Sequence, residues 1–304
     1  MMKSKSEFIQ LVSKFDQVMV YKNYHFKDNN TFQINYLIET LIVPYDVYSL
    51  KKIILYAIEY ELEYVIIGNG SKILFSSNYV KKIVILLKDN FNRISFDGRN
   101  VYAASGASLA KVIHYAYQYE LGGMEKLVGI PASIGGAIYK NAGAHQSDIS
   151  QFILKVDYID SFGQFKTLTK EECQFNYRSS IFQKKKKWVI IGAMFDLPKV
   201  HVEEKKEEMK FYLLYRNQHQ PINKKNSGSI FKNPPNQYAA QLIESCNLKG
   251  YKINDAMISN QHANFIINEK NAMPKDIMEL ISLIQQKVYE KYQIQLELEL
   301  EIIY

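Results

Sequence analysis

Residues 129–137 read Gly129-Ile130-Pro131-Ala132-Ser133-Ile134-Gly135-Gly136-Ala137, and the chain continues through Asn141-Ala142-Gly143-Ala144. Glycine has no Cβ, so the backbone N–H groups of such a stretch can approach a bulky ligand closely. One Gly-Gly pair by itself indicates a buried turn equally well. A second glycine loop, Gly68-Asn69-Gly70-Ser71, follows an apolar strand predicted at Val65–Ile67. Two such loops in one domain favour a large cofactor that carries phosphate.

The chain has 304 residues, of which 47% are hydrophobic, enough for two domains with a sizeable core. It has no apolar run of about 18 residues, so we expect no transmembrane helix. The charged, mixed N-terminal residues predict a helix near Glu7–Asp16 and not a signal peptide. Cys173 and Cys246 stand far apart without metal-ligand spacing. They indicate reduced thiols in a cytoplasmic protein that holds no metal.

A formal net charge of +7 favours anionic partners. A basic nucleic-acid-binding protein is one interpretation, but the aromatic residues are not interleaved with basic ones in a recognisable module. The one dense basic run, Lys184–Lys187, lies before an apolar strand predicted at Trp188–Phe195. It favours a solvated hairpin turn over a binding surface.

Helices, strands and hairpins alternate along the chain in a way typical of an α+β protein. Helices are predicted at residues 47–60, 108–119, 202–215 and 238–246. Strands are predicted at 83–87, 257–259, 264–268 and 294–302, and hairpin turns at 97–98 and 162–164. A long amphipathic helix begins at Pro274, with the apolar stripe Ile277, Leu280, Ile281, Ile284 and Val288. We place a domain boundary within residues 198–220.

The first glycine loop could be mistaken for a dinucleotide-binding fingerprint, which needs Gly-x-Gly-x-x-Gly at the start of a helix. Here Lys72 and Ile73 follow Ser71, and more apolar residues come next. The pattern therefore predicts strand, loop, strand, with a ligand held by loop amides instead of a helix N-terminus.

Three polar segments complete the set of motifs: Tyr177-Arg178-Ser179-Ser180, Gly228-Ser229-Ile230-Phe231-Lys232-Asn233-Pro234 and His262-Ala263-Asn264-Phe265. Singly, each is explained by a turn or a surface ion pair. Taken in order with the two glycine loops, they resemble the MurB family of UDP-N-acetylenolpyruvoylglucosamine reductases over about residues 30–303. The compact C-terminal part resembles the shorter form of that family, which lacks an extra substrate-covering loop.

The resemblance implies a vanillyl-alcohol-oxidase (PCMH)-type FAD-binding domain with two lobes over residues 31–200, after an N-terminal helical extension over 1–30. A small α+β substrate-binding domain follows over 201–304. It also implies noncovalent FAD, NADPH as reductant, and reduction of enolpyruvyl UDP-N-acetylglucosamine to UDP-N-acetylmuramate, a cytosolic step of peptidoglycan precursor synthesis. We expect a monomer that binds this UDP-sugar and NADPH, and neither nucleic acid nor membrane.

The alternative is another FAD-dependent oxidase of the same superfamily that acts on a sugar or an alcohol. Many such oxidases tether FAD covalently to a histidine or a cysteine. His114 and His145 are present, but neither lies in a motif that supports attachment.

Carried over by motif, Arg178 is the cation that stabilises the enolate, and Ser229 is the proton donor. The third residue is a glutamate in the last strand, where Glu297, Glu299 and Glu301 alternate with leucines as on an ordinary solvated edge. The register of the family pattern selects Glu299. The residues expected to bind FAD are Gly68, Asn69, Gly70, Ser71, Lys72, Ile73, Gly129, Ile130, Pro131, Ser133, Ile134, Gly135, Gly136, Ala137, Asn141 and Gly143. Those expected to bind substrate are Tyr177, Lys232 and Asn233.

The chain departs from the family pattern in two places that bear on cofactor contacts. The Thr-Phe-Arg-x-Gly-Gly motif is Thr31-Phe32-Gln33-Ile34-Asn35-Tyr36 here, without the arginine and both glycines. The asparagine that usually follows Gly-x-Gly-Ser is Lys72.

Overall fold

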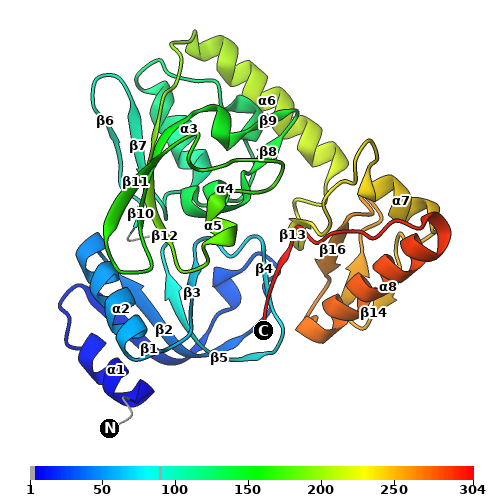
Figure 1. Ribbon diagram of the computed structural model, residues 1–304. Coiled ribbons are helices and arrows are strands. Elements are labelled where there is room, and N and C mark those ends of the chain that lie inside the picture. The colour runs from blue at the N-terminus through cyan, green and yellow to red at the C-terminus, as the bar shows by residue number, and fades with distance from the viewer. Residues whose placement is uncertain (1–3, 89–90) are drawn as a thin grey trace. The chain divides into compact units, whose positions relative to one another are not determined.

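The structure is a computed structural model that describes residues 4–88 and 91–304 (Figure 1). Its residues form two compact units. The first consists of Met1–Asn23, Ile38–Asn69 and Lys81–Leu213, and the second of Tyr24–Leu37, Gly70–Val80 and Leu214–Tyr304. Each unit is thus built from separate stretches of chain. The contiguous division at residues 30 and 200 stays a prediction.

The first unit contains two hydrophobic cores, and one of them lies between a four-stranded sheet and two helices. Ser4 begins the first helix with a reciprocal cap: its hydroxyl accepts from the Glu7 N–H and its own N–H donates to the Glu7 carboxylate. The sheet has the order β1-β2-β5-β3, and β3 and β5 are parallel. The elements are α1 (Lys5–Val12), β1 (Val18–His25), β2 (Leu37–Pro44), α2 (Val47–Glu59), β3 (Tyr64–Ile67) and β5 (Tyr79–Leu86).

The second core of this unit lies between a five-stranded antiparallel sheet, ordered β11-β10-β12-β7-β6, and the helices α3 and α4. Two separate cores agree with the two lobes expected from the sequence. The elements are β6 (Ile94–Phe96), β7 (Val101–Ala104), α3 (Leu109–Tyr117), α4 (Ile134–Lys140), β8 (Gly143–Ala144), β9 (Ser147–Asp148), β10 (Ile153–Ile159), β11 (Phe165–Thr169), α5 (Ile181–Lys184) and β12 (Val189–Phe195). Short 3-10 turns lie at Lys27–Asn29, Glu125–Leu127 and Ile149–Gln151. Helix α6 (Val202–His219) follows and continues into the second unit.

The second unit contains an antiparallel sheet ordered β13-β16-β15-β14 and a parallel pair, β4 and β17. Helix α8 buries its whole predicted apolar stripe, and Pro274 begins it as expected. The elements are β4 (Ile73–Phe75), β13 (Lys225–Ser229), α7 (Ala239–Ser245), β14 (Lys252–Ile253), β15 (Ala256–Ile258), β16 (Phe265–Asn268), α8 (Pro274–Tyr292) and β17 (Glu301–Ile303).

The two predicted hairpins are confirmed as β6–β7 and β10–β11, and the first glycine loop does join two strands, β3 and β4. Four predictions were wrong. The N-terminal helix expected near Glu7–Asp16 is Lys5–Val12. The last strand covers only Glu301–Ile303, because its partner β4 is equally short. The helix expected to end near Tyr215 continues to His219. The Lys184–Lys187 run is exposed as expected, but it begins at the last residue of the short helix α5, so it is not a hairpin turn. Strands β1 and β2 were not predicted.

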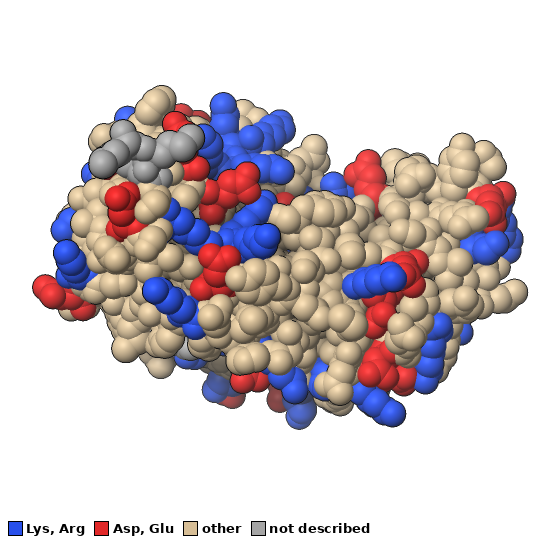
Figure 2. Space-filling model, turned by 90° about the horizontal axis from the view of Figure 1, so that it is seen from below, with Lys and Arg blue, Asp and Glu red and all other residues tan. Residues whose placement is uncertain are grey.

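The structure also bears on the expectations about membrane spans, cysteines and surface charge. Among residues 4–88 and 91–304, no helix is both long and apolar enough to cross a membrane. Both cysteines are free, and burial raises the pKa of the Cys173 thiol to about 12. On the face shown in Figure 2, basic and acidic side chains are interspersed with uncharged surface.

Candidate active site

The first two residues of the loop Gly68–Ser71 meet the second glycine loop within the first unit. A Cβ on Gly68 would overlap the hydroxyl of Ser133, so only glycine allows this approach. One residue later, the Asn69 side-chain amide donates to the Pro131 carbonyl at 3.4 Å. Segments more than 60 residues apart in sequence therefore form one continuous stretch of small residues and backbone amides.

The second loop is fixed to the chain before α3 and leaves a buried hydroxyl beside it. The Gly135 N–H donates to the Ser105 carbonyl at 2.7 Å, and the Ile134 N–H donates to Ala107 at 2.8 Å. Ser105 is buried, and its hydroxyl has no hydrogen-bond partner within the described residues. A buried polar group without a partner is costly. A polar ligand at this loop would supply the missing hydrogen bond, which fits the expected FAD.

Arg178 lies in the first unit, where its guanidinium holds the chain that follows the second loop. It donates to the carbonyl oxygens of Asn141, at 3.4 Å, and Gly143, at 2.5 Å. The guanidinium also lies over the ring of Tyr177, 5.3 Å from its centroid. Asn141 ends α4, and its side-chain amide bonds Asn176 and Ser150. The predicted catalytic cation is thus attached to the predicted flavin loop.

Ser229 lies in the second unit, at the end of β13, where the pairing with β16 is irregular. The register shifts between Asn226 and Ser229, and Gly228 within the bulge has φ +70°. A bulge bends a strand and turns the next side chain out of the regular alternation. Gly228 meets the positive φ that this geometry requires at no steric cost. The bulge at Gly228 therefore sets the position of Ser229, the predicted proton donor.

Glu299 is nearly buried, and an ammonium group pairs with it. Its side chain is only 12% exposed, and its Oε1 lies 3.0 Å from the Nζ of Lys72. Glu297, two residues earlier, is 74% exposed. The two glutamates therefore have different environments, although the sequence places both on one face of an alternating pattern. The Glu299 N–H donates to the carbonyl of Ile230, next to Ser229, at 2.8 Å.

The residues expected to bind substrate have other contacts in the structure. Lys232 pairs with Glu297 at 3.3 Å, and the Asn233 side-chain oxygen accepts from the Ala239 N–H at the start of α7. Tyr177 is exposed. Lys72, expected among the cofactor residues, instead directs its amine to Glu299 and to the Ser229 carbonyl. Whether these residues contact ligands stays a prediction.

Asn264, to which the motifs assign no role of its own, fixes the backbone after Ser229. Its side chain both donates to the Phe231 carbonyl, at 2.8 Å, and accepts from the Phe231 N–H, at 2.9 Å. Its own carbonyl accepts from the Ile230 N–H at 2.8 Å. Burial lowers the pKa of the neighbouring His262, whose Nδ1 accepts from the Asn264 N–H. The motif His262–Phe265 could be recognised in the sequence, but the hydrogen bonds that its asparagine makes could not be predicted from it.

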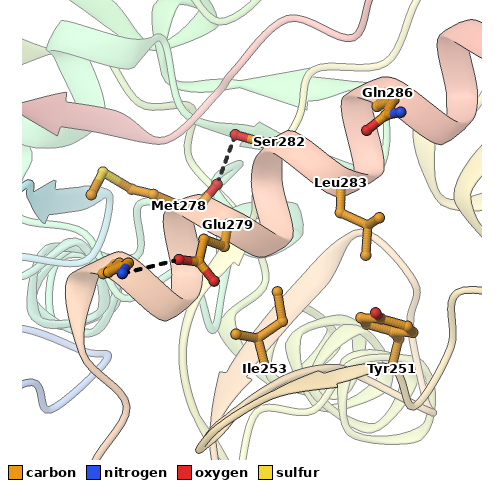
Figure 3. Close-up of a pocket in the computed structure, with 8 residues that line it drawn as sticks. Tyr251, Ile253, Met278, Glu279, Ser282, Leu283 and Gln286 are labelled. Atoms are coloured by element: carbon orange, nitrogen blue, oxygen red, sulfur yellow. Dashed lines mark hydrogen bonds and ion pairs between the residues drawn. The ribbon is translucent and has the colours of Figure 1, made fainter.

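A pocket of about 520 Å³ lies elsewhere in the second unit, between α8 and the strand β14 region (Figure 3). Its lining is mainly apolar, with a Lys275–Glu279 pair at one end, 3.6 Å apart. None of the predicted catalytic, cofactor or substrate residues lines it. The lining residues are Tyr251, Ile253, Lys275, Met278, Glu279, Ser282, Leu283 and Gln286.

Two family models match separate parts of the chain. Residues 38–169 match an FAD binding domain, and residues 220–303 match the UDP-N-acetylenolpyruvoylglucosamine reductase, C-terminal domain. With the adjoining glycine loops, these matches define an FAD-dependent oxidoreductase and confirm the predicted fold class and cofactor.

Individual relatives narrow the assignment. The UDP-N-acetylenolpyruvoylglucosamine reductases of Bacillus pumilus and Anoxybacillus flavithermus are 34% and 36% identical to this chain, each over 93% of it and 94% of the relative. The crystal structure of UDP-N-acetylenolpyruvylglucosamine reductase (MurB) from Thermus caldophilus superposes with a TM-score of 0.79, at 30% identity. That match covers 95% of this chain and 100% of the other. The chain belongs to the UDP-N-acetylenolpyruvoylglucosamine reductase family, as its motifs indicated.

Gly136 offers a test of the proposed flavin loop, because the chain itself leaves space at this position. A Cβ there would meet only the Ser133 hydroxyl, at an ordinary contact distance of 3.4 Å, whereas one on Gly135 would press on Ser105 at 3.0 Å. We expect Gly136→Val to fold but to lose bound FAD, since the added side chain would occupy ligand space. Flavin absorbance per protein and thermal unfolding of the apoprotein measure the two effects. Full flavin occupancy in this variant would contradict the assignment of the loop.

Proposed function

We propose that this protein reduces the enolpyruvyl ether of UDP-N-acetylglucosamine to UDP-N-acetylmuramate with NADPH, a cytoplasmic step of peptidoglycan precursor synthesis. The chain belongs to this reductase family, and the observation that supports the proposal most directly is the environment of Ser229. The motif residue Ser229 and the nearly buried carboxylate of Glu299 lie on segments that are directly hydrogen-bonded to each other. NADPH and the cellular location rest on the family resemblance.

FAD, when bound, supplies two-electron transfer between the nicotinamide and the enol ether. The residues that would hold it are the loop Gly68–Ile73 and the segment 129–137. The groups proposed to meet the phosphate and polar edges of the dinucleotide are backbone N–H groups of the first loop and the hydroxyl of Ser105, which lies beside the second segment. Noncovalent binding is proposed because neither His114 nor His145 lies in an attachment motif.

Arg178 is proposed to stabilise the negative charge that develops on the carboxylate side of the reduced enol ether. A fixed cation is most effective when its position does not change as the charge forms. The carbonyl oxygens of Asn141 and Gly143 already hold this guanidinium in place. Tyr177, Lys232 and Asn233 are proposed to contact the sugar or diphosphate.

Ser229 is proposed to donate the proton that completes the reduction. A serine hydroxyl is a weak acid, so it protonates only a strongly basic centre such as the enolate carbon. Glu299 is proposed as the carboxylate that supports this step from the same part of the second unit. Donation from a positioned acid contributes about 10²- to 10⁴-fold to a rate.

Steady-state kinetics test the proposed function. Because one flavin serves both half-reactions, NADP⁺ should leave before the UDP-sugar reacts, and double-reciprocal plots should give parallel lines. Flavin bleaching by NADPH and by NADH, followed by reoxidation with the enolpyruvyl UDP-sugar, measures each half-reaction separately. Intersecting lines would contradict the alternating mechanism. Flavin that stays on the denatured chain would favour the oxidase alternative.

A further inference from the structure

Lys72 joins the backbone at Ser229 to the carboxylate of Glu299. Its Nζ lies 3.0 Å from the Glu299 Oε1 and donates to the Ser229 carbonyl at 2.6 Å. A longer contact of 3.5 Å reaches the Ser227 carbonyl. All of these residues belong to the second unit. One ammonium group therefore touches both segments that carry the proposed proton donor and the proposed carboxylate.

The backbone around Lys72 fixes where its side chain begins. The Glu301 N–H donates to the Lys72 carbonyl at 3.0 Å, and the Ser227 hydroxyl donates to the carbonyl of Ser71 at 2.7 Å. A Cβ on Gly228 would stand 3.3 Å from the Lys72 Nζ, so glycine leaves room for the ammonium. The Lys72 amine thus contacts β13 and Glu299, the residue two positions before β17.

Lys72 and Glu299 are largely shielded from solvent, so the ammonium group of Lys72 has a strong effect on the net charge around Glu299. The side chains of Lys72 and Glu299 are 22% and 12% exposed, so solvent screens them less than the surface pairs. A carboxylate in such a place without a cation would repel the carboxylate and diphosphate of an anionic substrate.

We propose that Lys72 is a positioning residue for the second half-reaction, holding Glu299 and the Ser229 backbone in register and cancelling the charge of Glu299. This inference rests on the proposed function. It also assigns the Lys72 amine to the catalytic segments and not to FAD, which differs from the expectation based on its place in the glycine loop.

Lys72→Met tests the proposal, with Lys249→Met as the matched control. Lys249 forms a more exposed pair with Glu244 at 2.6 Å in the same unit, and that pair touches neither Ser229 nor Glu299. We expect Lys72→Met to retain FAD and flavin reduction by NADPH. Reoxidation by the enolpyruvyl UDP-sugar should slow on the order of 100-fold, as a small misplacement of reacting groups can cost. Lys249→Met should match the wild type in both half-reactions.

Conservative and double variants separate positioning from a general structural role. Lys72→Arg retains the charge and should recover most of the reoxidation rate. Lys72→Gln removes the charge but retains N–H donors, and it replaces the Met variant if that one unfolds. In a Glu299→Gln background, Lys72→Met should slow reoxidation by a smaller factor than in the wild type, because one of the two groups that Lys72 holds is already lost.

Three results would overturn the inference alone: reoxidation of Lys72→Met at the rate of Lys249→Met, loss of FAD from Lys72→Met, or fully additive effects with Glu299→Gln. A wild-type enzyme that NADPH reduces but the UDP-sugar does not reoxidise would overturn the proposed function, and this inference with it.

Discussion

Ser229→Ala should slow reoxidation of the reduced flavin by the enolpyruvyl UDP-sugar about 10²- to 10⁴-fold, the usual contribution of a positioned acid. Flavin reduction by NADPH should stay nearly intact, because no proton is delivered to carbon in that half-reaction. The expected pattern is that of an interaction made only in the transition state of the second step. Rapid mixing with absorbance detection of the flavin measures both rates on one preparation.

Ser282→Ala is a suitable control for the serine variant. Ser282 lies on the exposed side of α8, where its hydroxyl donates to the Met278 carbonyl at 3.0 Å. Removing that hydroxyl should change neither half-reaction. If Ser229→Ala reoxidised as fast as Ser282→Ala, Ser229 would not be the proton donor, whatever the flavin-binding domain does.

Glu299→Gln should also spare flavin reduction by NADPH and slow reoxidation by the UDP-sugar by about 100-fold or more, in the range of acid–base effects. Glutamine has nearly the shape of glutamate but lacks its charge, so the variant leaves the Lys72 ammonium without the carboxylate 3.0 Å away. The same rapid-mixing measurement applies, with flavin content per protein as a check on folding.

Glu297→Gln is the matched control for this variant, since Glu297 lies two residues away and is 74% exposed. Exposed ion pairs such as its contact with Lys232 contribute little. A larger loss of reoxidation rate in Glu297→Gln than in Glu299→Gln would show that the family register had selected the wrong glutamate.

Much of the architecture could be predicted from the sequence, because local residue patterns determine where many of the helices, strands and turns form. The apolar stripe of α8 and the glycine turn at Gly98 depend on nearby residues alone. The last strand was predicted too long, because alternation from Ile294 to Ile302 says nothing about partners, and β4 pairs with only three residues.

The surroundings of the candidate site were harder to predict. Motifs indicated Ser229 and Glu299, but the alternating glutamates look identical in sequence, and only the fold shows that Glu299 is much less exposed than Glu297. Lys72 follows the first glycine loop, so the sequence assigned it to the cofactor. Its long flexible side chain reaches segments more than 150 residues later in the chain. The residues next to Lys72 in the sequence do not indicate which segments its amine contacts.

The side chain of Asn264, which both donates to and accepts from Phe231, has a consequence for the dynamics of the site. Together with the Ile230 N–H bond to the Asn264 carbonyl, it holds the backbone after Ser229 in one conformation before any substrate arrives. The reorganisation needed to reach the reactive geometry is then confined to side-chain torsions. Aspartate could accept from the Phe231 N–H but, when ionised, could not donate to its carbonyl. Chemical conversion of this one amide during ageing of the protein would therefore loosen the backbone next to the proposed proton donor without altering any residue that touches substrate.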